Sequence, residues 1–104
     1  MAMKKAKIID KVNSTKLDWT FLSNHSHILI CLYRDPTVRL RDLALNVGIT
    51  ERAVMNIIED LESVGILDRL KEGRRNKYKI HESIPLRHPL EAHKKIGDLL
   101  KLLK

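Results

Sequence analysis

The sequence is poor in cysteine and contains no long apolar run. Its 104 residues include one cysteine, Cys31, which excludes an internal disulfide and fits a reducing compartment. The longest unbroken apolar run, Ile28 to Tyr33, has six residues, whereas a membrane-spanning helix needs about 20. The beginning of the chain, MAMKKAKIIDKV, is too polar for the apolar region of a signal peptide. We therefore expect a cytoplasmic protein that does not enter a membrane.

Aromatic residues are also scarce, at 4% of the sequence, although 43% of all residues are hydrophobic. Aliphatic side chains must therefore fill the core. A chain of 104 residues fits one domain. Because a domain of this size buries a smaller fraction of its surface than a large one, dimerisation would be a natural source of additional stability.

What the sequence has in excess is positive charge, with a formal net charge of +7. Residues 68–87 hold seven Lys and Arg against three Asp and Glu, whereas residues 51–67 hold one against four. The densest stretch, KEGRRNKYKI at residues 71–80, contains three lysines and two arginines. Like charges this close repel one another, so the stretch favours an anionic partner such as a nucleic acid.

Apolar spacing predicts a helix that starts at Ser23 or Asn24, where either side chain can cap it. The helix should end near Asp35, because Pro36 disfavours helical backbone in the preceding residue. Residues 37–40, TVRL, are β-branched in part and are expected to form a short strand.

Two further helices should lie on either side of a tight turn, Gly48–Ile49–Thr50. Gly48 can adopt the positive φ that ends a helix, and Thr50 is a good N-cap for the next one. That second helix should end at Val64–Gly65. The apolar faces of the two helices are Leu40, Leu43, Ala44 and Val47, followed by Val54, Ile57, Ile58 and Leu61.

After Ile66 the period changes from helix to strand. ILDRLK and KYKI are predicted to pair as a hairpin with Glu72–Asn76 as its turn, and Tyr78 and Ile80 on its apolar face. The last segment, about 89–104, is predicted to be a helix. Its apolar stripe consists of Leu90, Ile96, Leu99, Leu100 and Leu103.

This order of elements predicts a mainly α fold with a small β-hairpin (α+β). Two helices joined by a short glycine-containing turn are typical of a helix-turn-helix, and a basic hairpin directly after them makes a winged helix-turn-helix. We expect this domain to span residues 17–104, including a C-terminal dimerisation helix. Residues 1–16 are interpreted as a basic N-terminal arm, with an ordered helix as the alternative.

The chain resembles the winged helix-turn-helix transcriptional regulators of the MarR and ArsR type, over about residues 19–103. The closest resemblance is to a compact prokaryotic group with the segments SNH, RLRDLA, VGITERAV, DLESVGIL, GRRNKY and PLRHPLE. The resemblance implies a homodimeric repressor or regulator that binds double-stranded DNA.

The outer face of the second motif helix, about 50–64, carries side chains suited to the edges of DNA bases. Arg52 matches guanine, Asn56 matches adenine, and Met55 can contact the methyl group of thymine. Thr50 is expected to divide its role between capping the helix and contacting a phosphate. We therefore expect this helix in the major groove.

The basic hairpin, residues 71–77, is expected to lie on the minor groove or along the phosphates. A narrow minor groove attracts arginine through its concentrated negative potential. The side chains predicted to contact DNA here are Arg74, Arg75 and Lys77, and those predicted to hold phosphates near the start of the first motif helix are Arg39 and Arg41.

The stripe on the C-terminal helix has two interpretations: it covers the core, or it forms the seam of a homodimer. We favour the seam, because five large aliphatic residues are more than a terminal helix of a small monomer readily hides. The predicted dimer residues are Trp19, Phe21, Leu90, Ile96, Leu99, Leu100 and Leu103.

Motifs for catalysis and cofactor binding are absent from the sequence. It contains no CxxC, HxxxH or HExxH motif, and no glycine loop for phosphates. We therefore expect no enzyme activity, no cofactor and no metal, with a metal held across a dimer by His88 and His93 as a minor alternative. The sequence identifies no small-molecule effector. A protein-interaction module and a structured-RNA-binding protein remain alternatives to DNA binding.

Overall fold

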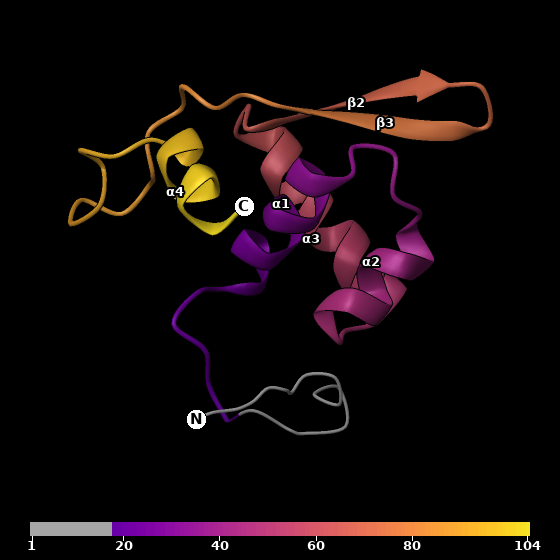
Figure 1. Cartoon of the computed structure of the whole chain (residues 1–104), viewed down its shortest axis with the longest axis horizontal. Helices are drawn as coiled ribbons and strands as arrows, with labels where there is room; N and C mark the ends of the chain where they lie inside the picture. The colour runs from indigo at the N-terminus through magenta and orange to yellow at the C-terminus, as the bar shows by residue number, and fades with distance from the viewer. Residues whose placement is uncertain (1–17) are drawn as a thin grey trace.

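The computed structural model describes residues 18–104, so the predicted arm at residues 1–16 lies outside the described residues. Figure 1 shows α1 at the centre, with α2 on one side, α4 on the other and the hairpin along the top. α1 contacts α2, α3, α4 and β3, and it therefore organises the packing. The elements in chain order are α1 (Asn24–Arg34), α2 (Leu40–Val47), α3 (Glu51–Ser63), β2 (Leu67–Glu72), β3 (Arg75–Ile80) and α4 (Ile96–Leu103).

The boundaries of the first three helices confirm the capping pattern in the sequence. The Ser23 hydroxyl accepts a hydrogen bond from the Ser26 backbone N–H at 3.3 Å, and α1 ends one residue before Pro36, at its C-cap Asp35. α2 ends at Gly48, whose φ of 85° is the left-handed conformation that glycine adopts without strain. α3 begins at Thr50, whose hydroxyl accepts from the Ala53 N–H at 3.0 Å. The helix-turn-helix turn is therefore as predicted.

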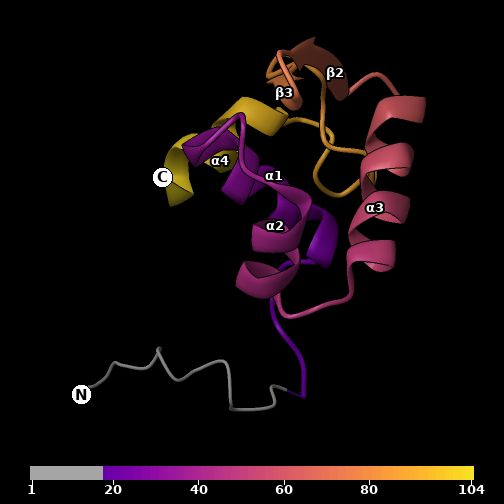
Figure 2. The ribbon, with the colours of Figure 1, turned by 90° about the vertical axis from the view of Figure 1, so that its right-hand side faces the viewer.

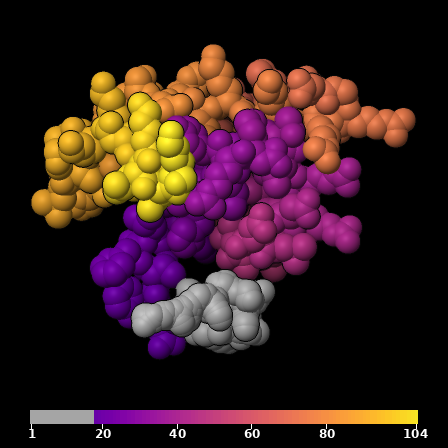
Figure 3. Space-filling model, viewed as in Figure 1, coloured from indigo at the N-terminus to yellow at the C-terminus, as the bar shows by residue number. Residues whose placement is uncertain are grey.

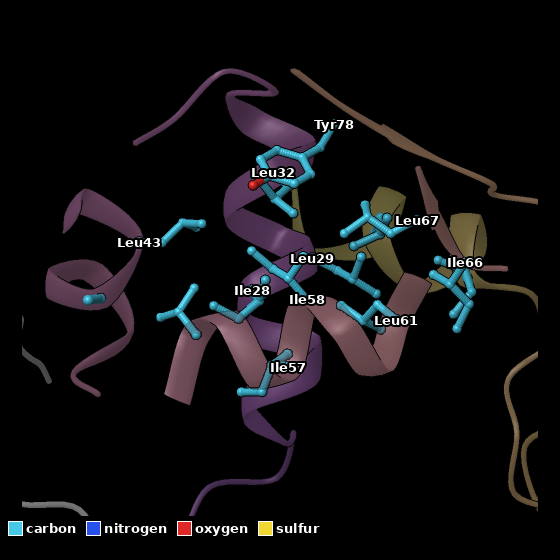
Figure 4. Packing of buried hydrophobic residues seen from close by; sticks show 14 residues of the cluster. Ile28, Leu29, Leu32, Leu43, Ile57, Ile58, Leu61, Ile66, Leu67 and Tyr78 are labelled. Carbon is cyan, nitrogen blue, oxygen red and sulfur yellow. The ribbon is translucent and has the colours of Figure 1, made fainter. Parts of the chain in front are cut away.

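The core is aliphatic and lies between α1, α3 and the base of the hairpin. Figure 4 shows Leu43 of α2, Ile58 of α3 and Tyr78 of β3 approaching α1 from different sides. All the residues predicted for the α3 core face are buried, as are two from the α2 face. The buried apolar residues are Ile28, Leu29, Leu32, Leu43, Ala44, Val54, Ile57, Ile58, Leu61, Ile66, Leu67, Tyr78, Ile96 and Leu100.

The hairpin pairs β2 with β3 in antiparallel register, with Leu67 opposite Ile80 and Glu72 opposite Arg75. Its turn is tighter than the predicted Glu72–Asn76, since only Gly73 and Arg74 separate the strands. Gly73 has a φ of 65°, which suits a two-residue hairpin turn.

The predicted strand at 37–40 is wrong. Residues 37–39 have no regular structure and Leu40 already belongs to α2. Two hydrogen bonds join residues 36–37 to β3: the Tyr78 N–H donates to the Pro36 carbonyl at 2.9 Å, and the Arg75 guanidinium donates to the Thr37 carbonyl at 3.3 Å.

The C-terminal helix is shorter than the predicted 89–104, because α4 begins at Ile96. The preceding residues fold back on themselves: the Leu86 N–H donates to the Lys94 carbonyl at 2.9 Å. The Asp98 carboxylate accepts the Lys95 N–H at 2.9 Å and fixes the start of the helix there. Leu90 consequently lies on a loop rather than on the helical stripe.

Ile96 and Leu100 do not fit the predicted dimer seam. They are 4% and 1% exposed and pack into the core of their own chain. The C-terminal helix therefore covers the core with one face, as the alternative interpretation held, and only its other face remains available to a partner.

Candidate nucleic-acid interface

The start of α3 and the end of the hairpin lie on the same side of the molecule. Figure 2, which looks onto the right-hand side of Figure 1, shows α2, α3 and the hairpin end together on this side. A groove of about 340 Å³ lies between Met55 of α3 and the hairpin end. Its lining comes from the segment before α2, the middle of α3 and the hairpin, and consists of Thr37, Val38, Arg39, Leu40, Met55, Arg74, Arg75, Asn76 and Tyr78.

The α3 side chains predicted to contact bases differ in their exposure. Arg52 and Asn56 are exposed, and no hydrogen bond or ion pair within residues 18–104 occupies them. Met55 is half-buried and lines the groove. The exposed Thr50 already accepts a bond from Ala53, so its capping role is established. Base contact by these side chains stays a prediction.

The basic side chains of the hairpin end, Arg74, Arg75 and Lys77, are exposed, and among the described residues two of them have a hydrogen-bond or ion-pair partner. Arg75 donates from Nη1 to the Thr37 carbonyl at 3.3 Å. Lys77 lies 3.9 Å from the Glu72 carboxylate, and both side chains are at least half exposed, so this pair contributes little to stability. Arg74 has no hydrogen bond or ion pair among the described residues and projects from the turn.

Arg39 and Arg41, predicted to hold phosphates, lie at the start of α2 and are exposed. Arg39 is the N-cap residue, provides no side-chain cap and lines the groove. Its guanidinium and those of the hairpin end therefore border one basic hollow, whereas Arg41 is not part of its lining.

Three of the four acidic residues of α3, Glu59, Asp60 and Glu62, lie toward its C-terminal end, away from the predicted base-contacting side chains, and two of these three are paired. Glu62 accepts two hydrogen bonds from the Arg69 guanidinium, at 3.0 and 2.9 Å, and this bonding raises the pKa of Arg69. Asp60 lies 2.9 Å from Nε2 of His25 on α1. Sequence reasoning missed both pairs, because they join residues of different elements.

A second hollow, of about 380 Å³, lies among α1, the C-terminal end of α3 and the loop before α4. It has an apolar lining that includes Leu61, Ile66 and Leu99, and polar groups that include His25 and Arg87. Figure 3 shows α4 and the loop before it on the left of the molecule, away from the end of the hairpin on the right. This hollow therefore belongs to a different surface from the basic groove.

Of the predicted dimer residues, Ile96 and Leu99 line this second hollow, and the others differ in exposure. Trp19 is 70% exposed and Phe21 92%, with their rings 5.1 Å apart in an edge-to-face contact. Leu90 is 83% exposed, while Leu99 and Leu103 are half-buried. Leu102, which the sequence interpretation omitted, is 79% exposed. Its spacing of three from Leu99 was the available signal, since it marks a second apolar face of α4.

Comparison with known proteins bears on the arrangement of α1, α2, α3 and the hairpin. Residues 23–68 match the family model for winged helix-turn-helix DNA-binding. The fold is a winged helix.

The chain is similar in structure to the PcaV transcriptional regulator from Streptomyces coelicolor in complex with its natural ligand, with a TM-score of 0.51 and 19% sequence identity. The similarity covers 79% of this chain but only 59% of that protein, and at this identity it shows the fold alone. No curated protein matches the sequence. Within the winged helix, α2 and α3 are the two motif helices and β2–β3 is the wing.

The single cysteine of the sequence, Cys31, is half-buried against the core, and this burial raises the pKa of its thiol. Across residues 18–104 no three His, Cys, Asp or Glu side chains come together as a possible metal site. No helix of the described part has the length and apolar character needed to cross a bilayer.

Proposed function

We propose that the protein is a sequence-specific regulator of transcription that binds double-stranded DNA in the cytoplasm as a homodimer. The observation that carries this proposal is that α3, with its exposed Arg52 and Asn56, lies on the same side of the molecule as the hairpin end, where the exposed Arg74 lines a basic groove. α3 enters the major groove with its N-terminal half, and the wing, residues 71–77, lies on the minor groove or on the phosphates.

The charge distribution supports this orientation. Arg74 and Arg75 of the wing and Arg39 before α2 border the groove, whereas the paired acids of α3 lie toward the C-terminal end of that helix. An orientation with the N-terminal half of α3 in the major groove keeps those acids away from phosphate oxygens. Glu51, at the start of α3, stabilises the positive end of the helix dipole.

The proposed dimer uses the surface remote from the wing. The exposed apolar side chains that support it are Trp19, Phe21, Leu90 and Leu102, and the half-buried Leu99 and Leu103 belong to the same helix as Leu102. An exposed group of large apolar residues is typical of a protein-binding surface. Two-fold symmetry would set two copies of α3 about 34 Å apart, one turn of DNA. Occupation of a promoter by such a dimer would repress transcription.

The test is selection of binding sites from random duplex DNA, followed by titration of the best site at several salt concentrations. We expect a palindromic site. A dimer with about 6–10 phosphate contacts should lose about 10³–10⁵ in affinity between about 50 and 200 mM salt. Preference for structured RNA over duplex DNA would contradict the proposal, and so would a monomer that binds neither.

Arg52→Ala provides the residue-level test. Because its guanidinium is proposed to contact one base pair, the variant should lose about 1–3 kcal/mol of discrimination at that position and little elsewhere. Arg41→Ala is the matched control, since it removes the same charge from an exposed residue proposed to hold a phosphate, and it should weaken binding to all sites alike without changing site preference. Equal site preferences for Arg52→Ala and the unmodified protein would exclude the proposed base contact.

A further inference from the structure

The wing is joined to the rest of the protein through a short turn that precedes α2. Asp35 is at the centre of this turn: its Oδ1 accepts from the Thr37 N–H at 3.1 Å and from the Thr37 hydroxyl at 3.2 Å. Its backbone carbonyl accepts from the Val38 N–H at 3.2 Å. One carboxylate therefore fixes the conformation of residues 35–38.

This turn presents two consecutive carbonyls to the wing. The Pro36 carbonyl accepts the Tyr78 N–H at 2.9 Å, and the Thr37 carbonyl accepts from the Arg75 guanidinium at 3.3 Å. The Tyr78 ring is 7% exposed and anchors the same strand in the core. β3 is thus attached from Tyr78 to Arg75, and only the Gly73–Arg74 turn extends beyond the last attachment.

We propose that residues 35–38 act as a brace that sets the position of the wing, with Asp35 as a positioning residue and Arg75 as its attachment point. The inference rests on the proposed DNA binding, in which both Arg74 and Arg75 reach DNA. Arg75 has five N–H donors, so the bond to Thr37 leaves others for a phosphate. The brace holds this guanidinium in place before DNA arrives, which lowers the entropy lost on binding.

The brace explains why a non-helical segment occupies the site where sequence analysis expected a strand. A regular strand at 37–40 would pair along β3, whereas the turn closed by Asp35 offers only two acceptors and lets α2 begin at Leu40. Asp35 is exposed and its side chain bonds only Thr37 among the described residues. Its carboxylate therefore acts on the wing through this turn and not through the core.

The test compares Asp35→Ala with Asp35→Asn in the full chain. Both variants remove the same negative charge, but asparagine keeps an oxygen that can accept the Thr37 bonds. Amide hydrogen exchange without DNA is the first measurement. The Tyr78 and Thr37 amides of Asp35→Ala should exchange about three- to tenfold faster than those of Asp35→Asn, as expected for loss of a hydrogen bond. The amides of α3 should serve as unchanged internal references.

Duplex affinity is the second measurement. Removing a negative charge near DNA should strengthen binding by itself, so Asp35→Asn should bind at least as tightly as the unmodified protein. Asp35→Ala should bind about three- to tenfold more weakly than Asp35→Asn. Equal exchange and equal affinity in the two variants would overturn the brace. Failure of the unmodified protein to bind duplex DNA would overturn the proposed function instead, and the exchange measurement would still decide the brace.

Discussion

Thr50 combines two roles that a small series of substitutions can separate. Its hydroxyl accepts the Ala53 N–H at 3.0 Å and caps α3, and its exposure leaves it available to a phosphate in the proposed complex. Thr50→Ala removes the cap. Loss of such a cap costs about 1 kcal/mol of unfolding free energy. In a domain of this size, that loss corresponds to a fall in Tm of about 4–8 °C.

Thr50→Asp retains the capping oxygen and adds a negative charge at the positive end of the helix dipole. We therefore expect its Tm to equal or exceed that of the unmodified protein. In the complex the same charge would face a phosphate. Two like charges about 4 Å apart repel by about 1 kcal/mol in water and by about 4 kcal/mol near a protein surface, which corresponds to a roughly five- to thousandfold loss of affinity.

The assays are thermal unfolding by circular dichroism and duplex binding by fluorescence anisotropy, at the same salt concentration. Thr50→Ser is the control, because it keeps a hydroxyl and should retain both properties. An unchanged Tm for Thr50→Ala would refute the energetic importance of the cap. Full duplex affinity for Thr50→Asp would refute the approach of a phosphate to the start of α3.

Three further predictions concern the core, the helix-turn-helix turn and the dimer. Ile58→Ala empties a site that is 0% exposed and should cost about 2–5 kcal/mol in urea unfolding, whereas the exposed Glu59→Ala should change stability by less than about 0.5 kcal/mol. Gly48→Ala should lower the free energy of unfolding by about 1–2 kcal/mol, because Gly48 has a φ of 85°, which alanine adopts only with strain. A steric clash would not contribute, since no atom lies within 4 Å of the added Cβ, and an unchanged Tm would contradict the strain. Leu102 is exposed, so Leu102→Glu should leave the fold of the monomer and the side chains proposed to contact DNA unchanged. It should convert the proposed dimer to a monomer in sedimentation equilibrium, and an unchanged mass would exclude Leu102 from the dimer seam.

Local signals in the sequence were sufficient for the helix-turn-helix and most of the wing. Ser23, Gly48 and Thr50 act on neighbouring backbone groups, so their effect on helix boundaries could be read without the tertiary structure. The alternation of Tyr78 and Ile80 with lysines likewise follows from the period of a strand. Exposure of Arg52 and Asn56 followed from assigning the buried face of the same helix.

The remaining features depend on contacts between distant parts of the chain. The apolar residues before Ile96 suggested a helix, but the Leu86–Lys94 hydrogen bond folds that segment into a loop. The burial of Leu100 depends on packing between α4 and α1, and apolar spacing alone cannot distinguish a core face from a dimer face. The attachment of Arg75 to Thr37 could not be predicted from local sequence either, because the two partners are 38 positions apart.

The junction between α3 and β2 has a consequence for the length of DNA that one protomer could contact in the proposed complex. The Ile66 N–H donates to the Leu61 carbonyl at 3.0 Å, and the Arg69 guanidinium of β2 donates to the Glu62 carboxylate of α3. These bonds fix the hairpin relative to α3. The distance between the start of α3 and the end of the hairpin is therefore fixed. Inserting one base pair between the positions that α3 and the hairpin contact in the proposed complex should therefore cost one of the two contacts, because the hairpin cannot shift to restore it.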